Sequence, residues 1–339
     1  ALRRGQRSPA PYADKREAQD ATTAAFVQAL ALDPTDGDVW NDLGTSLFFA
    51  GEKAASETVY AAGLRHAPRH AALRKEAAHM AAYPPVEAEH QAAVGGFGDA
   101  AFERVELPLG SFSAKTESDL SAGAELFGEA PPVFVSRTPL LTPAECSRAI
   151  EAAEAWAAAK GGWTTSRHYS VPTTDVPLAE LAGALPWFNA ALRRTLLPAL
   201  ASRYPAVTPE VARLSVLDCF LVKYSAAAQN KLPTHADQSL LSFTISLNAP
   251  SKYEGGGTWF EALGRPIDAP GAGHVIMFPG KVEHGGNPIT AGTRYVIVLF
   301  MGYSANRSGR DDGYVLDLLR DAGIGAASGG APHGGKDEL

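Results

Sequence analysis

The segment His235-Ala-Asp-Gln-Ser-Leu-Leu-Ser-Phe-Thr-Ile-Ser-Leu-Asn248 combines two potential metal ligands with the start of an apolar, β-branched stretch. His235 and Asp237 are two positions apart, so on an extended chain their side chains point to the same face. A third potential ligand, His284, follows 47 residues after Asp237. Two histidines and one carboxylate suit Fe(II), although zinc can bind the same atoms. We therefore predict that these three residues hold a metal ion, with iron favoured.

Arg294 lies ten residues after His284 and begins the apolar stretch Arg294-Tyr-Val-Ile-Val-Leu-Phe300. A buried cation at the start of a strand needs an anion nearby. A dicarboxylate co-substrate can provide one through a paired contact with the guanidinium group. The alternative is an ordinary charge at a strand edge. We predict that Arg294 binds a carboxylate-bearing co-substrate beside the metal.

The residues around these candidates form short segments rich in β-branched and aromatic side chains, separated by Gly, Pro and Asn. Such segments are typical of strands joined by turns. A strand is also expected at 133–136, and helices from Thr142 to Gly161 and over 187–203. This order predicts an α+β fold in which a double-stranded β-helix, or jelly roll, carries helices on one side. The later strands are expected at 214–224, 241–248, 257–262, 273–278 and 293–303.

The N-terminal part contains a helical repeat. Pro34 and Pro68 are 34 residues apart, and between them lie Trp40-Asn-Asp-Leu-Gly44 and Tyr60. This order and period resemble the tetratricopeptide repeat, a helix-turn-helix unit, although Ser56 departs from its pattern. The alternative is a generic alanine-rich helical hairpin. Because about two repeats cannot bury both faces of a repeat array, we expect this unit to pack on the rest of the chain.

Composition limits the classes of protein that remain. The 339 residues are 45% apolar and carry a formal net charge of −7, which argues against a general nucleic-acid binder. No apolar run approaches the about 18 residues of a membrane span. With only Cys146 and Cys219, the chain has no disulfide framework. A single bridge is possible, but burial of both as small apolar residues is the stronger expectation.

The motifs together resemble a known catalytic domain, the one shared by prolyl 4-hydroxylases and procollagen lysyl hydroxylases. The resemblance covers roughly 130 to 305 and is most specific from 215 to 303. It rests on four segments of the sequence, which are His235–Asn248, Tyr253–Phe260, Phe278–His284 and Gly292–Tyr295.

This resemblance implies a ligand set and a set of cofactors. His235, Asp237 and His284 would bind Fe(II), and Arg294 would bind the distal carboxylate of 2-oxoglutarate. Tyr224 matches a tyrosine that often contacts the co-substrate, although it is equally well a core aromatic residue. O₂ is the second co-substrate, and ascorbate is expected as the reductant. Arginine at 294 is closer to the lysyl hydroxylases, because prolyl 4-hydroxylases generally use lysine there, so the target amino acid stays open.

Candidate substrate contacts lie in two places. The segment Trp163-Thr-Thr-Ser-Arg167-His168 connects the capped helix to the strands, in a region that related enzymes place near the substrate. Its aromatic and cationic groups suit a peptide, but a solvated connection is the alternative. Trp259, in the segment before Phe260, is a further candidate.

Lys336-Asp-Glu-Leu339 matches the retrieval signal of the endoplasmic reticulum, so we expect that lumen as the location.

Along the chain we expect five successive regions. The expected regions are a flexible lead-in at 1–20, a tetratricopeptide-like module at 21–83, a linker at 84–130, an Fe(II)/2-oxoglutarate oxygenase domain at 131–305 and a tail at 306–339.

The predicted function is hydroxylation of a peptidyl proline or lysine, coupled to decarboxylation of 2-oxoglutarate to succinate. Collagen prolyl hydroxylases also carry tetratricopeptide-like helices that bind peptide, so the helical module is expected to bind peptide or a partner protein. Phe48 or Phe49, whichever faces outward, and Tyr83 are the aromatic candidates for this contact. The alternatives are a small-molecule oxygenase whose repeats recruit partners, and a repeat-based interaction protein without catalysis.

Overall fold

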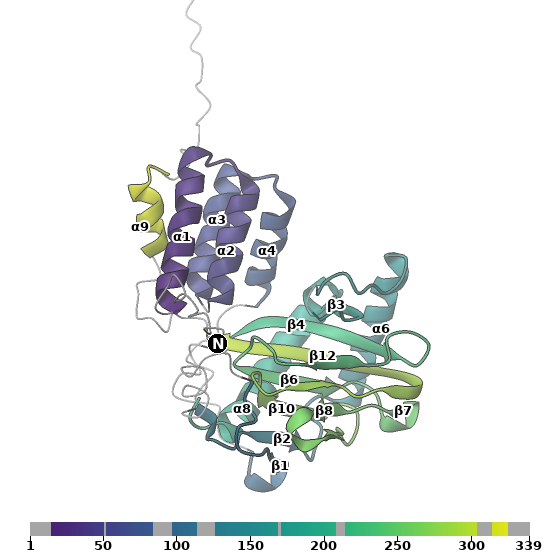
Figure 1. Cartoon of the computed structure of the whole chain (residues 1–339). Helices are drawn as coiled ribbons and strands as arrows, with labels where there is room; N and C mark the ends of the chain where they lie inside the picture. The colour runs from purple at the N-terminus through teal and green to yellow at the C-terminus, as the bar shows by residue number, and fades with distance from the viewer. Residues whose placement is uncertain are drawn as a thin grey trace, which may run out of the picture. The chain divides into compact units, whose positions relative to one another are not determined.

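The chain divides into two compact units, one of residues 1–81 with 303–339 and one of residues 82–302. We call them the helical unit and the sheet unit (Figure 1). None of the described helices is long and apolar enough to cross a membrane. The computed structural model describes residues 15–50, 52–83, 97–113, 126–168, 171–207, 214–303 and 314–324, so Lys336–Leu339 lies outside it.

The helical unit is built from α1 (Lys15–Leu32), α2 (Gly37–Phe49), α3 (Lys53–His66), α4 (Ala71–Ala82) and α9 (Tyr314–Asp321). The first helix begins at Lys15, inside the region expected to be a flexible lead-in. Near the start of α1, the side-chain amide of Gln19 donates to Ser46 Oγ of α2 at 3.2 Å. This contact with α2 helps to hold the polar start of α1 in place. The start of α2 follows from Asp36, whose carboxylate accepts hydrogen bonds from two backbone amides of the first turn.

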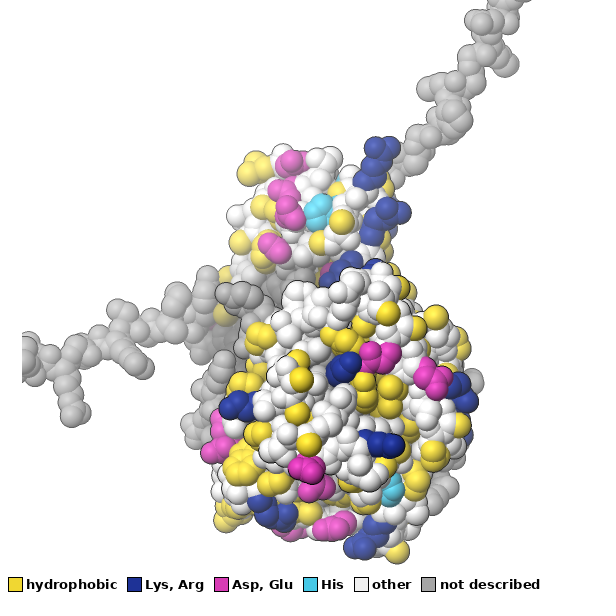
Figure 2. Space-filling model, turned by 90° about the vertical axis from the view of Figure 1, so that its right-hand side faces the viewer, with side chains coloured by type: hydrophobic (Ala, Val, Ile, Leu, Met, Phe, Trp, Pro, Cys, Tyr) yellow, Lys and Arg dark blue, Asp and Glu magenta, His cyan; other side chains and the backbone are white. Residues whose placement is uncertain are grey.

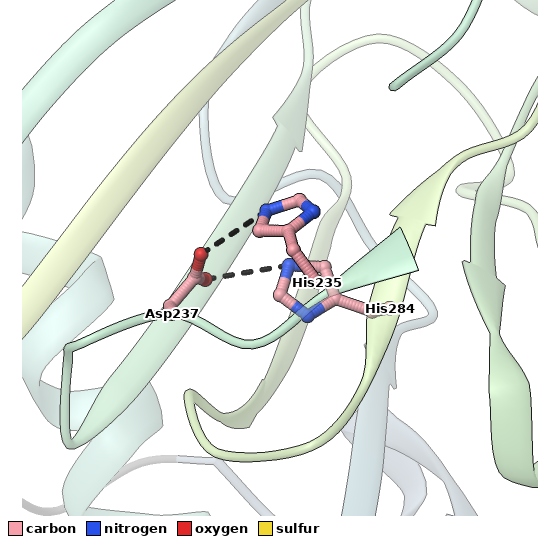
Figure 3. Close-up of side chains that lie close together, drawn as sticks. All are labelled: His235, Asp237 and His284. Carbon is pink, nitrogen blue, oxygen red and sulfur yellow. Dashed lines mark ion pairs between the residues drawn. The ribbon is translucent and has the colours of Figure 1, made fainter. Parts of the chain in front are cut away.

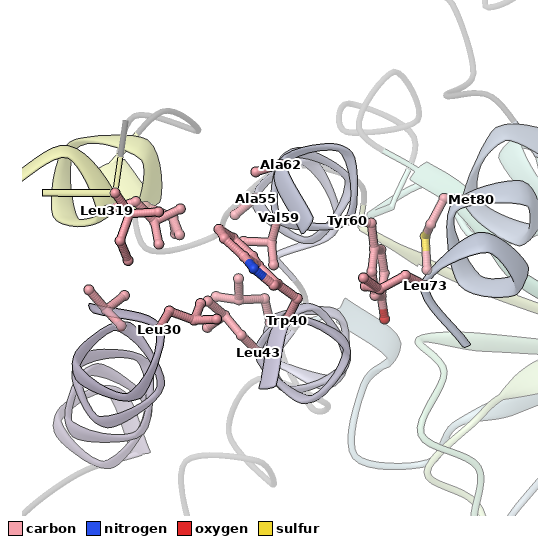
Figure 4. Close-up of a cluster of buried hydrophobic side chains, with 14 residues drawn as sticks. Leu30, Trp40, Leu43, Ala55, Val59, Tyr60, Ala62, Leu73, Met80 and Leu319 are labelled. Carbon is pink, nitrogen blue, oxygen red and sulfur yellow. The ribbon is translucent and has the colours of Figure 1, made fainter. Parts of the chain in front are cut away.

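Two glycines allow α2 and α3 to approach closely. A Cβ atom at Gly44 would lie 2.5 Å from the Tyr60 ring, and one at Gly63 would lie 2.8 Å from Trp40 Cβ. Trp40 and Tyr60 are both buried between these helices. Both belong to one apolar core shared by the five helices (Figure 4). The departure at Ser56 is accommodated because its hydroxyl donates to the Gly44 carbonyl at 2.7 Å.

The helix α9 lies in the region expected to be a C-terminal tail, so residues 314–321 of that region are helical. It packs on α1 and α3, with Val315 and Leu319 buried in the helical core. The Tyr314 hydroxyl donates to Glu52 Oε2 at 2.7 Å. An eight-residue helix is marginal by itself, so its sequence pattern gives a weak signal and tertiary packing supplies its stability. The helical repeat thus packs on another part of the chain, as expected, and that part is α9.

The sheet unit contains two antiparallel sheets among the described residues, with helices beside them (Figure 1). This mixed architecture is consistent with a jelly roll. The larger sheet has the order β1 (Phe102–Glu106), β2 (Pro132–Ser136), β10 (Val275–Pro279), β6 (Leu241–Ser246), β12 (Ile289–Tyr303), β4 (Leu214–Ser225) and β3 (Asp175–Pro177), with β7 (Tyr253–Gly255) paired to β12. The smaller sheet has the order β5 (Leu232–His235), β11 (His284–Gly286), β8 (Thr258–Phe260) and β9 (Arg265–Ile267).

Several short strands lie outside the predicted strand segments, and one of them, β1, lies inside the region predicted to be a linker. It pairs with β2 from Phe102 opposite Ser136 to Glu106 opposite Pro132. Its burial pattern explains why composition does not reveal it, since only Phe102 is fully buried in the strand. A polar strand at the edge of a sheet lacks the apolar alternation that marks a central strand.

Helices cover one face of the larger sheet. The predicted capping box is present: Thr142 and Glu145 exchange hydrogen bonds at the start of α6 (Pro143–Ala159). The Lys223 side chain of β4 and the Tyr295 hydroxyl of β12 both donate to Glu154 Oε1 of α6, which places α6 against the face to which they point. The predicted helix at 187–203 is formed by α7 (Ala184–Ala191), the π-helical turn η4 (Leu192–Leu196) and α8 (Leu197–Arg203). Short 3₁₀ turns occur at η2 (Asp99–Ala101), η3 (Leu178–Glu180), η6 (Pro250–Lys252) and η7 (Glu261–Leu263).

The opposite face of the larger sheet packs on the smaller sheet. Phe278 of β10 packs with Phe260 of β8, and Tyr224 of β4 with Leu232 of β5. Arg294 and Tyr295 are neighbours on β12, so they point to opposite faces, and Arg294 points toward the smaller sheet. Cys146 and Cys219 are both buried and free, as the stronger expectation had it.

Figure 2 shows acidic and basic side chains interspersed over the face of the sheet unit that it displays. Neither sign of charge gathers there among the described residues. The surface charge of this face therefore does not single out a class of partner.

Candidate metal centre

The strand pairing of the smaller sheet brings His235 and His284 together. His235 ends β5 and His284 begins β11, and the two residues lie directly opposite each other in the antiparallel register. Their ring centroids are 4.7 Å apart. Asp237 follows two residues after His235, and one ligand atom from each of the three side chains lies within 4.8 Å of the others. Figure 3 shows both imidazole rings directed at the carboxylate.

Backbone carbonyls fix the orientation of both imidazole rings. His235 Nδ1 donates to the Pro233 carbonyl at 2.8 Å, and His284 Nδ1 donates to the Val282 carbonyl at 2.9 Å. A ring nitrogen that carries the donated proton leaves the other nitrogen of the neutral ring as a lone-pair donor. Both Nε2 atoms face Asp237, His235 Nε2 at 3.3 Å from Oδ1 and His284 Nε2 at 3.3 Å from Oδ2.

The charges of this cluster depend on one another. Burial raises the pKa of Asp237, but the adjacent His284 and His235 outweigh burial and hold the pKa of the carboxyl well below its ordinary value. Burial lowers the pKa of His235, but the hydrogen bond and charge of Asp237 outweigh burial and raise it. Asp237 is 6% exposed. The Asp237 carboxylate therefore stays ionised. Its negative charge favours a positive charge beside it, either on a protonated imidazole or on a metal ion.

A buried cation lies on the same side of the larger sheet. Arg294 is 3% exposed, and its Nε atom has no hydrogen-bond partner. Among the described residues no carboxylate forms an ion pair with it, and its Cζ lies 5.5 Å from the centre of the Tyr224 ring. A buried guanidinium without a counterion is costly. This site could therefore stabilise the carboxylate of a ligand.

Tyr224 connects Arg294 to the histidine–aspartate cluster. Burial raises the pKa of Tyr224, while the charge of Arg294 lowers it and the charges of Asp237 and Asp175 raise it, so all three charges lie near the phenol. A Cβ atom at Gly286 would lie 2.8 Å from the Tyr224 hydroxyl, which places the phenol beside the strand that begins with His284. The predicted metal ligands and the predicted co-substrate residues thus share one region between the sheets.

The structure places Trp163 away from this region. Its indole Nε1 donates to Glu154 Oε2 of α6 at 3.1 Å, and its ring lies 6.4 Å from the Tyr295 ring. Because Tyr295 and Arg294 point to opposite faces of β12, Trp163 lies on the α6 side of the larger sheet. This geometry gives Trp163 a role in fastening the segment after α6.

Arg167 and His168 lie nearer to the centre but are already engaged. The Arg167 guanidinium pairs with Asp175 at 2.6 Å and with Asp218 at 2.8 Å, and its Cζ lies 4.5 Å from the Phe220 ring. It also donates to His168 Nε2 at 2.6 Å. Burial lowers the pKa of Arg167, but the two carboxylates outweigh burial and raise it. Arg167 is therefore an internal cross-link between the segment at 163–168 and β3 and β4.

Trp259 lies on the smaller sheet with its indole directed away from the centre. Its Nε1 donates to Glu261 Oε2 at 3.0 Å, and it faces Gly285 across the strand pair. The neighbouring Phe260 points inward instead, 6.4 Å from the His284 ring. Trp259 is thus on the outer face of the sheet that carries both histidines.

Two of the aromatic candidates for peptide contact are not exposed on the helical unit. Tyr83 belongs to the sheet unit, where it is buried and its hydroxyl donates to the Cys219 carbonyl at 3.3 Å. Phe48 is partly buried against the helical core. The side chain of Phe49 lies outside the described residues. As a buried residue of the sheet unit, Tyr83 is not available for the peptide contact for which it was a candidate.

Sequence reasoning missed the hydroxyl groups behind Asp237. Ser242 Oγ donates to Asp237 Oδ2 at 2.5 Å, and Ser239 Oγ lies 2.7 Å from Ser242 Oγ. Both serines are buried. The available signal was the presence of two serines on the apolar, buried stretch that follows His235, where hydroxyl groups need partners.

Comparison with known proteins adds a sequence relationship. No family model matches the chain. Over 175 residues the chain is 29% identical to multifunctional procollagen lysine hydroxylase and glycosyltransferase LH3 of Rattus norvegicus, covering 48% of this chain and 22% of the relative. It is 30% identical to procollagen-lysine,2-oxoglutarate 5-dioxygenase 1 of Gallus gallus, covering 48% and 23%. The chain is similar to procollagen lysine hydroxylases.

These similarities have clear limits of extent. The matched region spans less than a quarter of the length of either curated relative. Among solved structures, a prolyl-4-hydroxylase from Pseudomonas putida matches with 16% identity and a TM-score of 0.38, over 55% of this chain and 98% of that one. A viral collagen prolyl hydroxylase from Paramecium Bursaria Chlorella virus-1 matches with 17% identity and a TM-score of 0.35, over 50% and 94%.

Proposed function

We propose that the chain is an Fe(II)- and 2-oxoglutarate-dependent dioxygenase that hydroxylates a peptidyl proline or lysine. The observation that carries the proposal is the clustering of His235, Asp237 and His284, with ligand atoms within 4.8 Å of one another. The buried Arg294 beside Tyr224 adds a binding group for a co-substrate anion. The sequence similarity to procollagen-lysine,2-oxoglutarate 5-dioxygenase points to the same chemistry.

The donor set fits iron. Two neutral imidazoles and one ionised carboxylate are the ligands of many non-heme Fe(II) sites, and they leave positions open for further ligands. The backbone carbonyls that hold both Nδ1 atoms keep each Nε2 free to bind, as is usual for histidines that ligate metals. His235, Asp237 and His284 are therefore the residues that would hold the ion.

The surroundings of Arg294 fit 2-oxoglutarate. A dicarboxylate could pair its distal carboxylate with the guanidinium group and direct its other end toward the metal. Tyr224, with its ring beside Arg294, would contribute a hydrogen bond from its hydroxyl. Because burial raises the pKa of Tyr224, the phenol stays protonated and remains a donor.

When bound, iron and 2-oxoglutarate would activate O₂, so that one oxygen atom enters the target as hydroxyl and the other enters succinate as CO₂ is released. The contribution of the chain is to bind and orient the reactants and to keep water away. The rings of Phe278 and Phe260 pack around His284, with centroids at 4.5 Å and 6.4 Å, and shield its ring from solvent. Ascorbate is the proposed reductant.

The substrate is proposed to be a peptide, and lysine is the first target to test because the similar curated proteins are named for lysine. Their named substrate, procollagen, belongs to the secretory pathway, which supports the endoplasmic-reticulum lumen as the proposed location. We further propose that residues 21–83 form a tetratricopeptide-like module that binds peptide or a partner protein. The range 131–305 is proposed as the oxygenase domain.

Mass spectrometry of peptide libraries tests the proposal. The full chain is incubated with Fe(II), 2-oxoglutarate, ascorbate and O₂, and the peptides contain lysine, proline or neither. A mass gain of one oxygen on lysine or proline, absent with Asp237→Ala, is the expected result. Turnover on free metabolites but on no peptide would point to a small-molecule oxygenase. Absence of any 2-oxoglutarate-dependent product, with iron bound, would overturn the proposal.

A further inference from the structure

The two oxygens of Asp237 have different surroundings. Oδ1 faces His235 Nε2 and Oδ2 faces His284 Nε2, each at 3.3 Å. Oδ2 also accepts a hydrogen bond from Ser242 Oγ at 2.5 Å, whereas no hydroxyl or amide among the described residues donates to Oδ1. Ser242 is 1% exposed, so water does not compete for its hydroxyl. A hydrogen bond to an ionised carboxylate is stronger than one between neutral groups. The carboxylate is therefore held through one specific oxygen.

A second hydroxyl fixes the direction of the first. Ser242 has a single hydroxyl hydrogen, and it is directed at Asp237. In the 2.7 Å contact between the two serines, Ser239 must therefore be the donor. The chain of donation runs from Ser239 to Ser242 to Oδ2, and each bond polarises the next.

The turn before His284 holds this hydroxyl chain in place. A Cβ atom at Gly280 would lie 2.2 Å from Ser239 Oγ, so only glycine leaves room for that side chain. The Asp237 amide donates to the Gly280 carbonyl at 2.8 Å, and Lys281 Nζ donates to the Asp237 carbonyl at 3.0 Å. The segment with Asp237 and the segment leading to His284 are thus fastened to each other beside the serines.

We propose that Ser242, supported by Ser239, is a positioning residue that occupies Asp237 Oδ2 and leaves Oδ1 as the single oxygen for the metal. The inference rests on the proposed function, because it assumes a metal held by Asp237 and the two histidines. A carboxylate that binds through both oxygens takes two coordination positions, whereas one that binds through Oδ1 takes only one. The serines would therefore preserve an open position that the co-substrates need.

Cobalt binding to the full chain tests the proposal without relying on turnover. Co(II) is titrated into the wild type, Ser242→Ala, Ser242→Thr and Ser246→Ala, and both affinity and visible absorption are recorded. Ser246 is the matched control, since it is buried on the same strand and face but its hydroxyl donates to the Asn248 carbonyl at 3.4 Å. Loss of a hydrogen bond to a ligating group typically weakens metal binding about 10- to 100-fold.

Ser242→Ala should bind Co(II) about 10-fold or more weakly and change the absorption bands, because the freed Oδ2 can join Oδ1 at the metal. Ser242→Thr keeps the hydroxyl and should restore both readouts, while Ser246→Ala should match the wild type. Ser239→Ala should give a smaller loss in the same direction. If Ser242→Ala does not fold, Ser242→Cys replaces it, since a thiol is a weak donor and should give a partial loss.

Three outcomes would overturn the proposal. Ser242→Ala could keep the wild-type affinity and spectrum, Ser246→Ala could lose affinity to the same extent, or threonine could fail to restore the spectrum in a folded protein. Each would remove the specific role of the hydroxyl. These results differ from failure of the proposed function, in which the wild type itself would bind no divalent metal at this cluster.

Discussion

The two units each bury a cation, and they treat it differently. Lys53 in the helical unit is 2% exposed and pairs with Glu57 at 3.3 Å, one helical turn away. Arg294 in the sheet unit is 3% exposed and has no carboxylate partner among the described residues. Both cations carry the cost of leaving water, but only Lys53 recovers it within the fold. A buried charge that the fold neutralises supports structure, whereas one that it leaves open indicates a ligand.

Buried hydroxyl groups repeat this contrast. In the helical unit Ser56 donates to the Gly44 carbonyl at 2.7 Å, which closes a helix-to-helix contact. In the sheet unit Ser242 donates to the Asp237 carboxylate, which already faces two imidazoles. The same residue type therefore satisfies backbone in one unit and orients a potential metal ligand in the other.

The strongest test of the contrast is removal of a predicted metal ligand. His235→Ala, His284→Ala and Asp237→Ala should each abolish turnover and most iron binding, because two remaining ligands make an inadequate site. His274→Ala is the matched control: this buried histidine also donates Nδ1 to a carbonyl, that of Ser136 at 2.8 Å, but it pairs with no carboxylate of the described residues. Iron content and peptide hydroxylation are measured. Near-normal activity in any of the three ligand variants would contradict the assignment.

Substitution of Arg294 should have the next largest effect. Arg294→Ala should keep iron but raise the 2-oxoglutarate requirement, since losing one partner of a buried charge pair costs on the order of 2–5 kcal/mol, or roughly 30-fold or more in affinity. Arg294→Lys should retain part of the activity, because the charge remains without the paired geometry. Apparent affinity for 2-oxoglutarate is measured by titrating succinate formation. An unchanged value in Arg294→Ala would exclude the residue from the site.

The sequence indicated which residues could form the candidate site more readily than it indicated the groups that contact them. His235 and Asp237 are local neighbours, so their shared face follows from strand geometry alone. That His284 lies opposite His235 requires the pairing of β5 with β11, which a local pattern does not specify. Arg167 looked available for substrate because its partner Asp218 is distant in sequence and only the folded sheet brings them together.

The fold follows the same division. The central strands β4, β6, β10 and β12 were predicted because both of their faces are largely buried and their residues are correspondingly apolar. The edge strand β1 and the helix α9 were missed, since each depends on a partner elsewhere in the chain. The tetratricopeptide-like assignment of 21–83 stays a prediction, although its helices and the burial of Trp40 and Tyr60 are present.

Separating the units should have a smaller effect than changing Arg294. A chain of residues 82–303 keeps Tyr83, which is buried in the sheet unit, and omits α9 together with the helices on which it packs. It should fold, bind iron and hydroxylate short peptides. If the helical unit binds substrate, its activity on long peptides should be lower than that of the full chain. Circular dichroism and hydroxylation of short and long peptides are measured.

The matched control is a chain of residues 84–339. It loses Tyr83 and exposes Val315 and Leu319 of α9, so it should be less stable by about 3 kcal/mol, the usual cost of removing a buried large aromatic side chain. Equal treatment of long and short peptides by the 82–303 chain would show that the helices do not bind substrate. Failure of that chain to fold would show that the units are not independent.

Glu145 sharpens the contrast within the sheet unit, because it is a buried carboxylate with structural partners. Burial raises its pKa, but hydrogen bonds from Thr142 and the pairing with Arg194 outweigh burial and lower the pKa from 4.5 to about 2. A depressed folded pKa gives stability that is complete above 4.5 and is lost as the pH falls toward about 2. Glu145→Gln should therefore cost about 1 kcal/mol at pH 7 and less at pH 3. Urea unfolding at both pH values measures this, and a cost that grows at pH 3 would contradict it.

Lys53 should give the smallest effect of all, although it is as deeply buried as Arg294. Lys53→Met removes one ion pair and fills the same space with an apolar chain, and such replacements are usually neutral or stabilising. Glu57 is 36% exposed, so water can solvate the carboxylate that remains. We expect a change in unfolding free energy within about 1 kcal/mol and unchanged hydroxylation of a short peptide. Arg294→Met, an equally conservative change of shape, should remove 2-oxoglutarate binding. Thermal unfolding and co-substrate titration of the two variants, measured side by side, separate the two kinds of buried charge. If Lys53→Met lost turnover on a short peptide while staying folded, the presence of a carboxylate partner would no longer distinguish a structural buried cation from a ligand-binding one.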